Sequence, residues 1–242
     1  MKKLMKAELY KFQYEKSLWI ISSVLIVCAC ISIFTRVYIN AEDTFANLGK
    51  DAMVLYLACA IYAGVSFTDE FSNRTIIHTI AHGYSRTQFL LAKVIHYLLG
   101  CILIIVAYLS ISSVIAVIAL GTSTPASVFI AHIVYTIFAG VPFYFVLAMV
   151  FFLFVIATRK GTLSIAGSVS FAILLVVFTN KAYSAQQFPE QSWLRLLPTI
   201  QLSMLYDGSL IFGEYLISAI LSIIFIFTMF LACIIIMRKV EL

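Results

Sequence analysis

Residues 67–93 of this 242-residue chain read FTDEFSNRTIIHTIAHGYSRTQFLLAK. This stretch decides how the chain is organised. It begins with the acidic residues Asp69 and Glu70 and ends with the basic residues Arg86 and Lys93. It is the only long segment of cytoplasmic character in a chain that is otherwise almost entirely apolar.

The composition predicts a membrane protein. Hydrophobic residues make up 63% of the chain and charged residues 11%, whereas a soluble domain carries about a quarter charged residues. This small number of charged residues cannot cover the surface of a soluble domain with so much apolar material. We therefore expect that lipid surrounds most of the chain. The predicted fold class is all-α.

Six apolar runs are long enough to count as membrane spans, because roughly 20 residues at ~1.5 Å each cross ~30 Å of hydrocarbon. With a single transmembrane domain over residues 1–242, the spans are expected at about 18–38, 52–68, 94–120, 127–157, 163–179 and 213–237. The first run follows five lysines and lacks a clean cleavage site, so it is interpreted as an uncleaved span rather than a signal peptide.

The Lys and Arg residues predict the orientation. With six spans both termini share a side, and that side collects twelve of the sixteen basic residues. The other side holds four: Arg36, Lys50, Lys181 and Arg195. Both termini and the 67–93 segment are therefore expected in the cytoplasm. The net charge of +5 reflects this bias and does not indicate nucleic-acid binding.

Several local features accompany the spans. Residues 1–16 resemble an interfacial helix with Met5, Leu9 and Phe12 on one face. Pro142 predicts a kink in the fourth span, which is interpreted as ordinary packing or as a hinge. The fifth span carries small residues that permit close helix packing: Gly161, Ser164, Gly167, Ser168 and Ser170. The loop 180–212 is half apolar and predicts short helices at the outer leaflet.

The sequence lacks the common catalytic and nucleotide-binding motifs. It contains no phosphate-binding GxxxxGK[ST], HExxH or GxSxG pattern. Ionisable residues lie at span ends, as His96 and His132 do, and not at mid-depth, which argues against proton- or ion-coupled transport. The five cysteines all lie in apolar runs and form no CxxC pair. No catalytic, cofactor-binding or metal-binding residue is predicted.

Two enzymatic interpretations of the 67–93 segment remain open. Asp69-Glu70-x-x-x-Arg74 is one substitution from the Glu-Glu-x-x-x-Arg motif of intramembrane CAAX-type proteases, which also need histidines on other spans. His78 and His82 are spaced four apart, as zinc ligands on a helix would be, but further ligands are not apparent nearby. A non-transport assembly or sensor subunit is a third alternative.

The interpretation that uses most of the segment is a docking element. Glu70 and Arg74 can pair at i, i+4 on a helix, residues 82–85 break that helix, and Ser85 can cap a second helix that enters the third span. Such a hairpin merges rigidly into two spans, so it could transmit a push from a soluble partner.

The pattern Glu-x-x-x-Arg-Thr-Ile, then Gly-Tyr-Ser-Arg, then Ala-Lys at the mouth of the third span resembles the permease subunits of type-2 ABC exporters. These include bacitracin, lantibiotic-immunity, drug and peptide-toxin exporters. The resemblance implies a coupling helix between spans two and three. Its ATPase-coupling residues would be Glu70, Phe71, Arg74, Thr75, Ile76, Ser85 and Arg86. Many members have Gly before the Thr, where this chain has Arg74.

The resemblance also implies the partners. Two cytoplasmic ATPase subunits would hold ATP and Mg, and two permease subunits, identical or different, would enclose the path in a bacterial plasma membrane. The expected cargo is a hydrophobic or amphipathic peptide or drug, including antimicrobial peptides, and the chain itself would hydrolyse nothing.

Overall fold

The chain is described from a computed structural model, which covers residues 2–35, 38–50, 53–72, 83–158, 160–184, 193–209 and 211–238. Over these ranges the secondary structure is helical, with no strand. The helices in chain order are α1 (Lys2–Tyr14), α2 (Lys16–Thr35), α3 (Ala41–Lys50), α4 (Met53–Ser72), α6 (Arg86–Leu120), α7 (Ala126–Thr158), α8 (Gly161–Ser184), η1 (Trp193–Leu196), α9 (Pro198–Asp207) and α10 (Phe212–Arg238). The predicted all-α fold is confirmed.

Within the described ranges, five helices are long and apolar enough to cross a membrane, namely α2, α6, α7, α8 and α10. The second expected span corresponds to α4, whose apolar part, Val54–Phe67, is shorter than the roughly 20 residues a span needs. α4 packs against α2, α6, α7 and α8, and its Ala60, Tyr62 and Ala63 side chains are fully buried. Protein rather than lipid therefore covers much of α4.

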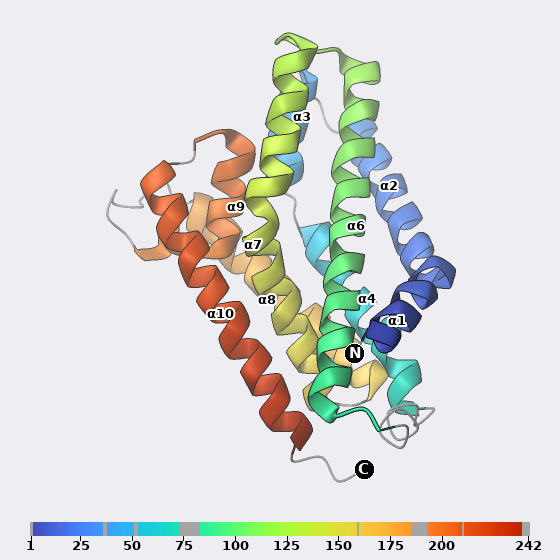
Figure 1. Cartoon of the computed structure of the whole chain (residues 1–242). Coiled ribbons are helices and arrows are strands. Elements are labelled where there is room, and N and C mark those ends of the chain that lie inside the picture. The colour runs from blue at the N-terminus through green and yellow to red at the C-terminus, as the bar shows by residue number, and fades with distance from the viewer. Residues whose placement is uncertain are drawn as a thin grey trace.

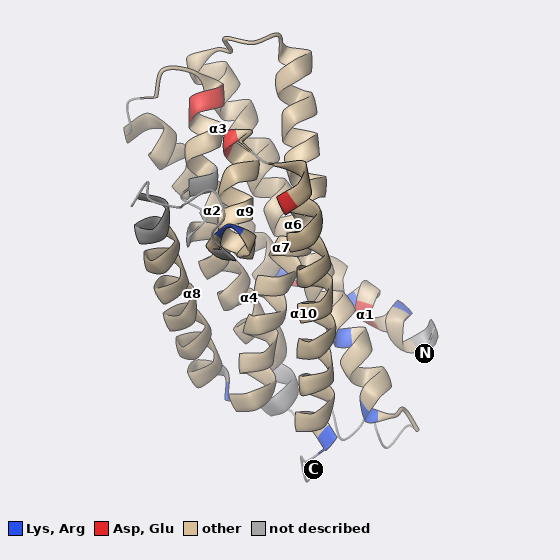
Figure 2. Cartoon of the chain, turned by 90° about the vertical axis from the view of Figure 1, so that its left-hand side faces the viewer, with Lys and Arg blue, Asp and Glu red and all other residues tan. Residues whose placement is uncertain are grey.

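The two ends of the bundle differ in what they carry. Figure 1 shows the N-terminus, the C-terminus and the start of α6 at one end, and the α6–α7 turn and α3 at the other. Most of the described Lys and Arg residues lie toward the end with both termini (Figure 2). We call this the terminal end and the opposite one the turn end.

Two short helices complete the turn end. Residues 39–51, between the first two expected spans, contain α3, whose buried residues Ala41, Thr44, Phe45 and Leu48 recur at helical spacing. The predicted short helices in 180–212 are present as η1 and α9. However, α9 is buried from Thr199 to Tyr206 and packs on α3 and α7 rather than lying on the surface.

Small residues let α4 and α8 pack closely. A Cβ on Gly64 would come within 2.1 Å of the Ile165 Cγ1 atom, and Ser164 and Ser168 on α8 are buried. The predicted small-residue face is therefore present in part, because Ser170 is exposed. In α7, Pro142 lies inside the helix, and the Tyr215 hydroxyl donates to the nearby Ala139 carbonyl at 3.3 Å.

Candidate functional site

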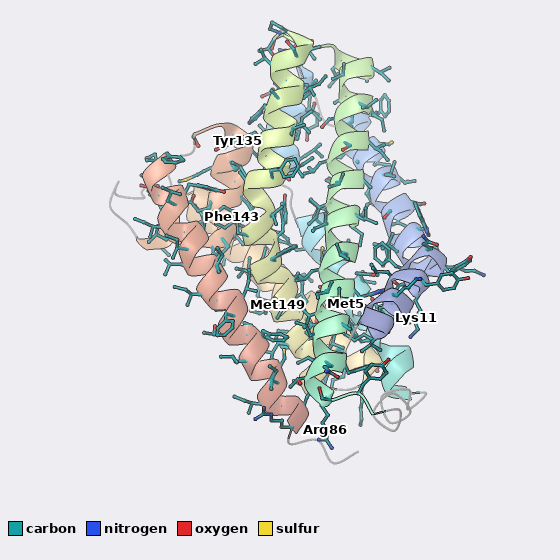
Figure 3. The ribbon with its side chains drawn as sticks, in the orientation of Figure 1. Met5, Lys11, Arg86, Tyr135, Phe143 and Met149 are labelled. Carbon is teal, nitrogen blue, oxygen red and sulfur yellow. The ribbon has the colours of Figure 1, made fainter. Side chains whose placement is uncertain are left out.

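The candidate site lies at the terminal end, where α1 packs across the lower part of α6. Figure 3 shows the two helices side by side, with Met5 and Lys11 on α1. The predicted apolar face of α1 is turned inward only in part: Met5 is half-buried and Phe12 packs on the core, but Leu9 is 46% exposed. Leu4 and Glu8 are buried as well, because the Glu8 carboxylate finds an ionic partner on α6.

That partner is Lys93. Its ammonium group donates to Glu8 Oε2 at 2.6 Å, and the two side chains are only 5% and 7% exposed. Lys93 also lies over the Phe89 ring, 5.7 Å from its centre, a distance at which a cation is attracted to the ring face. Lys11 approaches the same carboxylate at 3.6 Å but is 58% exposed. Glu8 and Lys93 therefore form a buried ion pair between α1 and α6.

A second contact lies one turn further along α6. His96 Nε2 lies 2.9 Å from Glu15 Oε2 and His96 Nδ1 lies 3.2 Å from the Glu8 carbonyl oxygen. Both neighbours are hydrogen-bond acceptors, so a doubly protonated imidazole would donate to both and balance the second carboxylate. The Tyr62 hydroxyl of α4 also donates to Glu15 Oε2, at 3.0 Å. We call Glu8, Glu15, Lys93 and His96 the ionic cluster.

Glu15 lies between α1 and α2, and its pKa reflects these contacts. Burial alone would raise the pKa of this carboxyl, but the hydrogen bond and the charge of His96, with the Tyr62 and Ser17 hydroxyls, lower it below its ordinary value. At Glu15 these hydrogen-bond donors stabilise the ionised form of the carboxyl more than burial destabilises it. The cluster is therefore built to hold Glu15 as a carboxylate.

Aromatic rings hold the cluster in place from the bundle side. Phe12 of α1 packs edge-on against His96, with the ring centres 5.2 Å apart. Tyr62 stacks on Tyr97 at 5.8 Å, and it has room because Gly100 has no side chain: a Cβ there would lie 2.3 Å from the Tyr62 ring. α1, α4 and α6 are thus joined at one place.

The start of α6 is sharply defined. Gly83 has a φ of +87°, a conformation that favours glycine. Ser85 then caps the helix: its hydroxyl accepts from the Gln88 amide at 3.2 Å, and the Gln88 side chain accepts from the Ser85 amide at 3.2 Å. This reciprocal arrangement is a capping box. The predicted capping role of Ser85 is confirmed.

Arg86, the first residue of α6, joins α6 to the end of α10. Its Nη1 atom donates to the carbonyls of Met237 and Arg238 at 3.2 and 3.3 Å. The last carbonyls of a helix lack intrahelical partners, so Arg86 supplies donors to them. Figure 3 shows Arg86 at the foot of α6, beside the end of α10. No local pattern in the sequence predicts this contact.

The other predicted coupling residues divide into two groups. Glu70 and Phe71 lie in the last turn of α4. Arg74, Thr75 and Ile76 lie outside the described residues, as do the candidate zinc ligands His78 and His82. Among the residues that the structure describes, no group of His, Cys, Asp and Glu could hold a metal ion. Of the predicted coupling residues, Ser85 and Arg86 therefore lie at the start of α6, the helix that also carries Lys93 and His96 of the ionic cluster.

Sequence reasoning missed Glu8 and Glu15 as members of the site. A signal was present, because these are the acidic residues of an otherwise Lys-rich segment and lie seven positions apart, on one side of a helix. Lys93 and His96 are three apart on α6 and also share a face. Nothing in the sequence, however, pairs one face with the other.

The sequence pattern of the family described as ABC-2 family transporter protein matches residues 4–178. The chain belongs to the ABC-2 transporter family. The match covers α1, α6 and hence the whole ionic cluster. As an ABC-2 permease, the chain is a multi-pass membrane protein and the membrane component of a transporter. A search of curated proteins gives no match.

Proposed function

We propose that this ABC-2 permease is the membrane subunit of an ATP-driven exporter for hydrophobic or amphipathic peptides or drugs. Two permease chains enclose the path, and two separate soluble ATPase subunits, which bind ATP and Mg, dock at the terminal end. Both termini and residues 69–93 lie in the cytoplasm of a bacterial cell. The Lys and Arg that gather at the terminal end support this orientation.

The observation that carries the proposal is how the foot of α6 is built. α6 starts at a capped residue directly after the predicted coupling segment, and within its first three turns it is joined to α1 by buried charges and to α10 by Arg86. A displacement of the coupling segment therefore moves three helices together. Such a rigid connection is what transmission from an ATPase requires.

The cargo class rests on the apolar character of the bundle. Apart from Lys16 and Arg238 at helix ends, the large exposed side chains of α2, α7 and α10 are aliphatic and aromatic, as Val27, Phe138 and Ile224 are. Surfaces of this kind offer little to a strongly charged solute. They suit peptides with apolar side chains, hydrophobic drugs and molecules that already reside in the bilayer.

The test is association with the ATPase that co-purifies with the chain from its native membrane. Glu70→Ala and Arg86→Ala should each lower co-purification and abolish transport, because removing one partner of a docked charge pair costs about 2–5 kcal/mol of binding. The thermal stability of each variant is measured alongside, because Arg86 also donates hydrogen bonds to the end of α10. Loss of such a hydrogen bond costs about 0.5–1.5 kcal/mol of folding free energy.

The same pair of variants separates transport from the protease interpretation. Glu70→Ala removes a residue of the protease-like motif, whereas Arg86 lies outside that motif. If Arg86→Ala keeps the ATPase and full transport while Glu70→Ala inactivates the protein, the docking proposal is wrong and intramembrane hydrolysis replaces it.

A further inference from the structure

A cavity of about 310 Å³ lies between α7, α8 and α10, under the η1–α9 segment. Its floor is formed by Val146 and Leu147 of α7, and its outer wall by Phe178 of α8 with Leu221 and Phe225 of α10. The floor residues are each 5% exposed, whereas the wall residues are 38–53% exposed. The cavity therefore runs from the apolar outer surface into the bundle. We call it the α8–α10 pocket.

One polar group in this apolar lining lacks a partner. Ser222 of α10 lines the pocket and is 2% exposed, and its hydroxyl makes no hydrogen bond to the described residues. A buried hydroxyl without a partner costs about 1–3 kcal/mol. A ligand in the pocket could supply the missing bond if rotation about χ1 to another staggered position turned the hydroxyl toward it.

Other serines of the bundle behave differently. Ser113 of α6 lines a separate groove between α6 and α7, and its hydroxyl donates to the Leu109 carbonyl at 2.6 Å. Ser218, one turn before Ser222, donates to the Leu196 carbonyl at 2.8 Å. Helical serines can thus use a backbone carbonyl. Among the described residues the hydroxyls of Thr136, Ser168 and Ser222 are buried without a hydrogen-bond partner, and of these three only Ser222 lines the α8–α10 pocket.

We infer that the α8–α10 pocket binds an uncharged, mainly apolar small molecule with one hydrogen-bonding oxygen, which enters from the lipid and bonds to Ser222. This inference rests on the proposed export function and names a binding position and a substrate class for it. The volume lies at the lower end of the range of ligand pockets, about 300–1,000 Å³. A charged group is excluded because no counter-charge lines the pocket.

Two photoreactive probes of equal length test the inference: a diazirine-bearing octanol and the corresponding diazirine-bearing octane. The purified full-length chain, in lipid nanodiscs without ATP, is irradiated with each probe, and labelled residues are identified by mass spectrometry. The octanol probe should label Val146 and Leu147 about fivefold more than the octane probe. Fivefold is what one hydrogen bond of about 1 kcal/mol provides.

Three variants sharpen the test. Ser222→Ala should remove the preference for the alcohol, and Ser222→Leu should reduce labelling of Val146 and Leu147 by both probes, because the larger side chain fills the pocket. Ser113→Ala is the matched control and should change neither value. Labelling of the exposed α2 residues Trp19 and Val27 reports the probe concentration in the lipid and should stay constant.

The inference is overturned if both probes label Val146 and Leu147 equally in the natural protein, or if Ser222→Leu leaves that labelling unchanged while the chain remains monodisperse and helical. Because the measurement needs no ATPase, its outcome is independent of the coupling proposal. ATP-driven transport without labelling of the pocket would leave export standing and remove this site.

Discussion

At the scale of the residue, the Glu8–Lys93 pair is where we expect a substitution to cost most. Lys93→Ala leaves the Glu8 carboxylate buried without its main partner, and an uncompensated buried charge costs about 3–5 kcal/mol. The variant should therefore unfold at a clearly lower temperature in detergent. It should also release α1, seen as faster proteolysis before residue 16.

Lys11→Ala is the matched control for that experiment. Lys11 contacts the same carboxylate but is 58% exposed, so its loss should cost only about 0–1 kcal/mol. The double variant Glu8→Gln with Lys93→Met removes both charges and should recover much of the stability. Equal effects of Lys93→Ala and Lys11→Ala would show that burial does not set the strength of this pair.

Ser85 and Glu8 show how far single residues could be predicted. A serine before an apolar helix and three residues before Gln88 signals a cap locally, so the role of Ser85 was readable from the sequence. The role of Glu8 depends on Lys93, 85 positions away. Arg86 is similar, since its partners are the Met237 and Arg238 carbonyls. Contacts across such separations follow from packing, which the local pattern does not contain.

At the scale of the element, the contact between α4 and α6 depends on a missing side chain. Gly100→Ala would place a Cβ 2.3 Å from the Tyr62 ring, whose hydroxyl is bonded to Glu15. A rigid ring held at both ends cannot move freely, so we expect a loss of about 1–3 kcal/mol. Thermal unfolding of the purified chain measures it.

Gly167→Ala controls for the general effect of adding a methyl group to a membrane helix. There the nearest atom to the new Cβ would be Phe154 Cδ1 at 3.5 Å, an ordinary contact. Alanine also favours helix over glycine by about 1 kcal/mol. Gly167→Ala should be neutral or stabilising, and a destabilisation as large as that of Gly100→Ala would contradict the steric explanation.

The attachment of α3 to the α6–α7 turn should depend on pH. Glu42 accepts hydrogen bonds from the Ser123 amide and from the amide and hydroxyl of Thr124, the last at 2.7 Å. The small desolvation of this carboxyl raises its pKa, but these donors lower the pKa from 4.5 to about 2. Its contribution is therefore complete above pH 4.5 and is lost as the pH falls toward 2.

The measurement is the unfolding temperature of the natural chain and of Glu42→Gln between pH 7 and pH 2. The difference in unfolding temperature between the natural chain and Glu42→Gln should be constant above about pH 5. It should vanish toward pH 2, because the protonated Glu42 carboxyl no longer differs in charge from the amide. Asp43→Asn, at the exposed neighbouring position, is the control. A difference that persists at pH 2 would exclude charge as the cause.

The long apolar elements were predictable and the short elements built on contacts were not. The long apolar runs that became α2, α6, α7, α8 and α10 stand out in the sequence, because lipid demands length. α3 does not, since its ten residues include Asn, Asp, Glu and Gly. It is a helix because Phe45 packs edge-on against Phe129 and onto Tyr206, with ring centres 5.9 and 5.2 Å apart.

At the scale of the whole molecule, the proposed orientation makes a definite prediction. A cysteine placed at Ser72 or Arg159, in a background without the natural cysteines, should resist a membrane-impermeant maleimide in intact cells. A cysteine at Thr124, in the α6–α7 turn, should react. The twelve-to-four division of Lys and Arg is the physical reason. Labelling of Ser72→Cys from outside would reverse the topology and remove the coupling segment from the ATPase side.

Membership of the ABC-2 family was accessible from the sequence because the motifs around Glu70 and Arg86 lie within one continuous stretch. The pocket under α9 was not, because it needs α7, α8 and α10 at once. A helix that is apolar on all its faces has no sequence pattern that marks its buried face. Only the assembled bundle shows which face of each helix is turned inward.

The separation between Glu8 and Lys93 also has a consequence for how the protein is made. The two residues are 85 positions apart, and a ribosome adds about 5–20 residues per second. Glu8 thus emerges about 4–17 s before its partner, and α2 can enter the bilayer while that carboxylate is still exposed to water. The α1–α6 junction closes only when α6 arrives, so the nascent chain passes through a stage in which its amino-terminal helix is free.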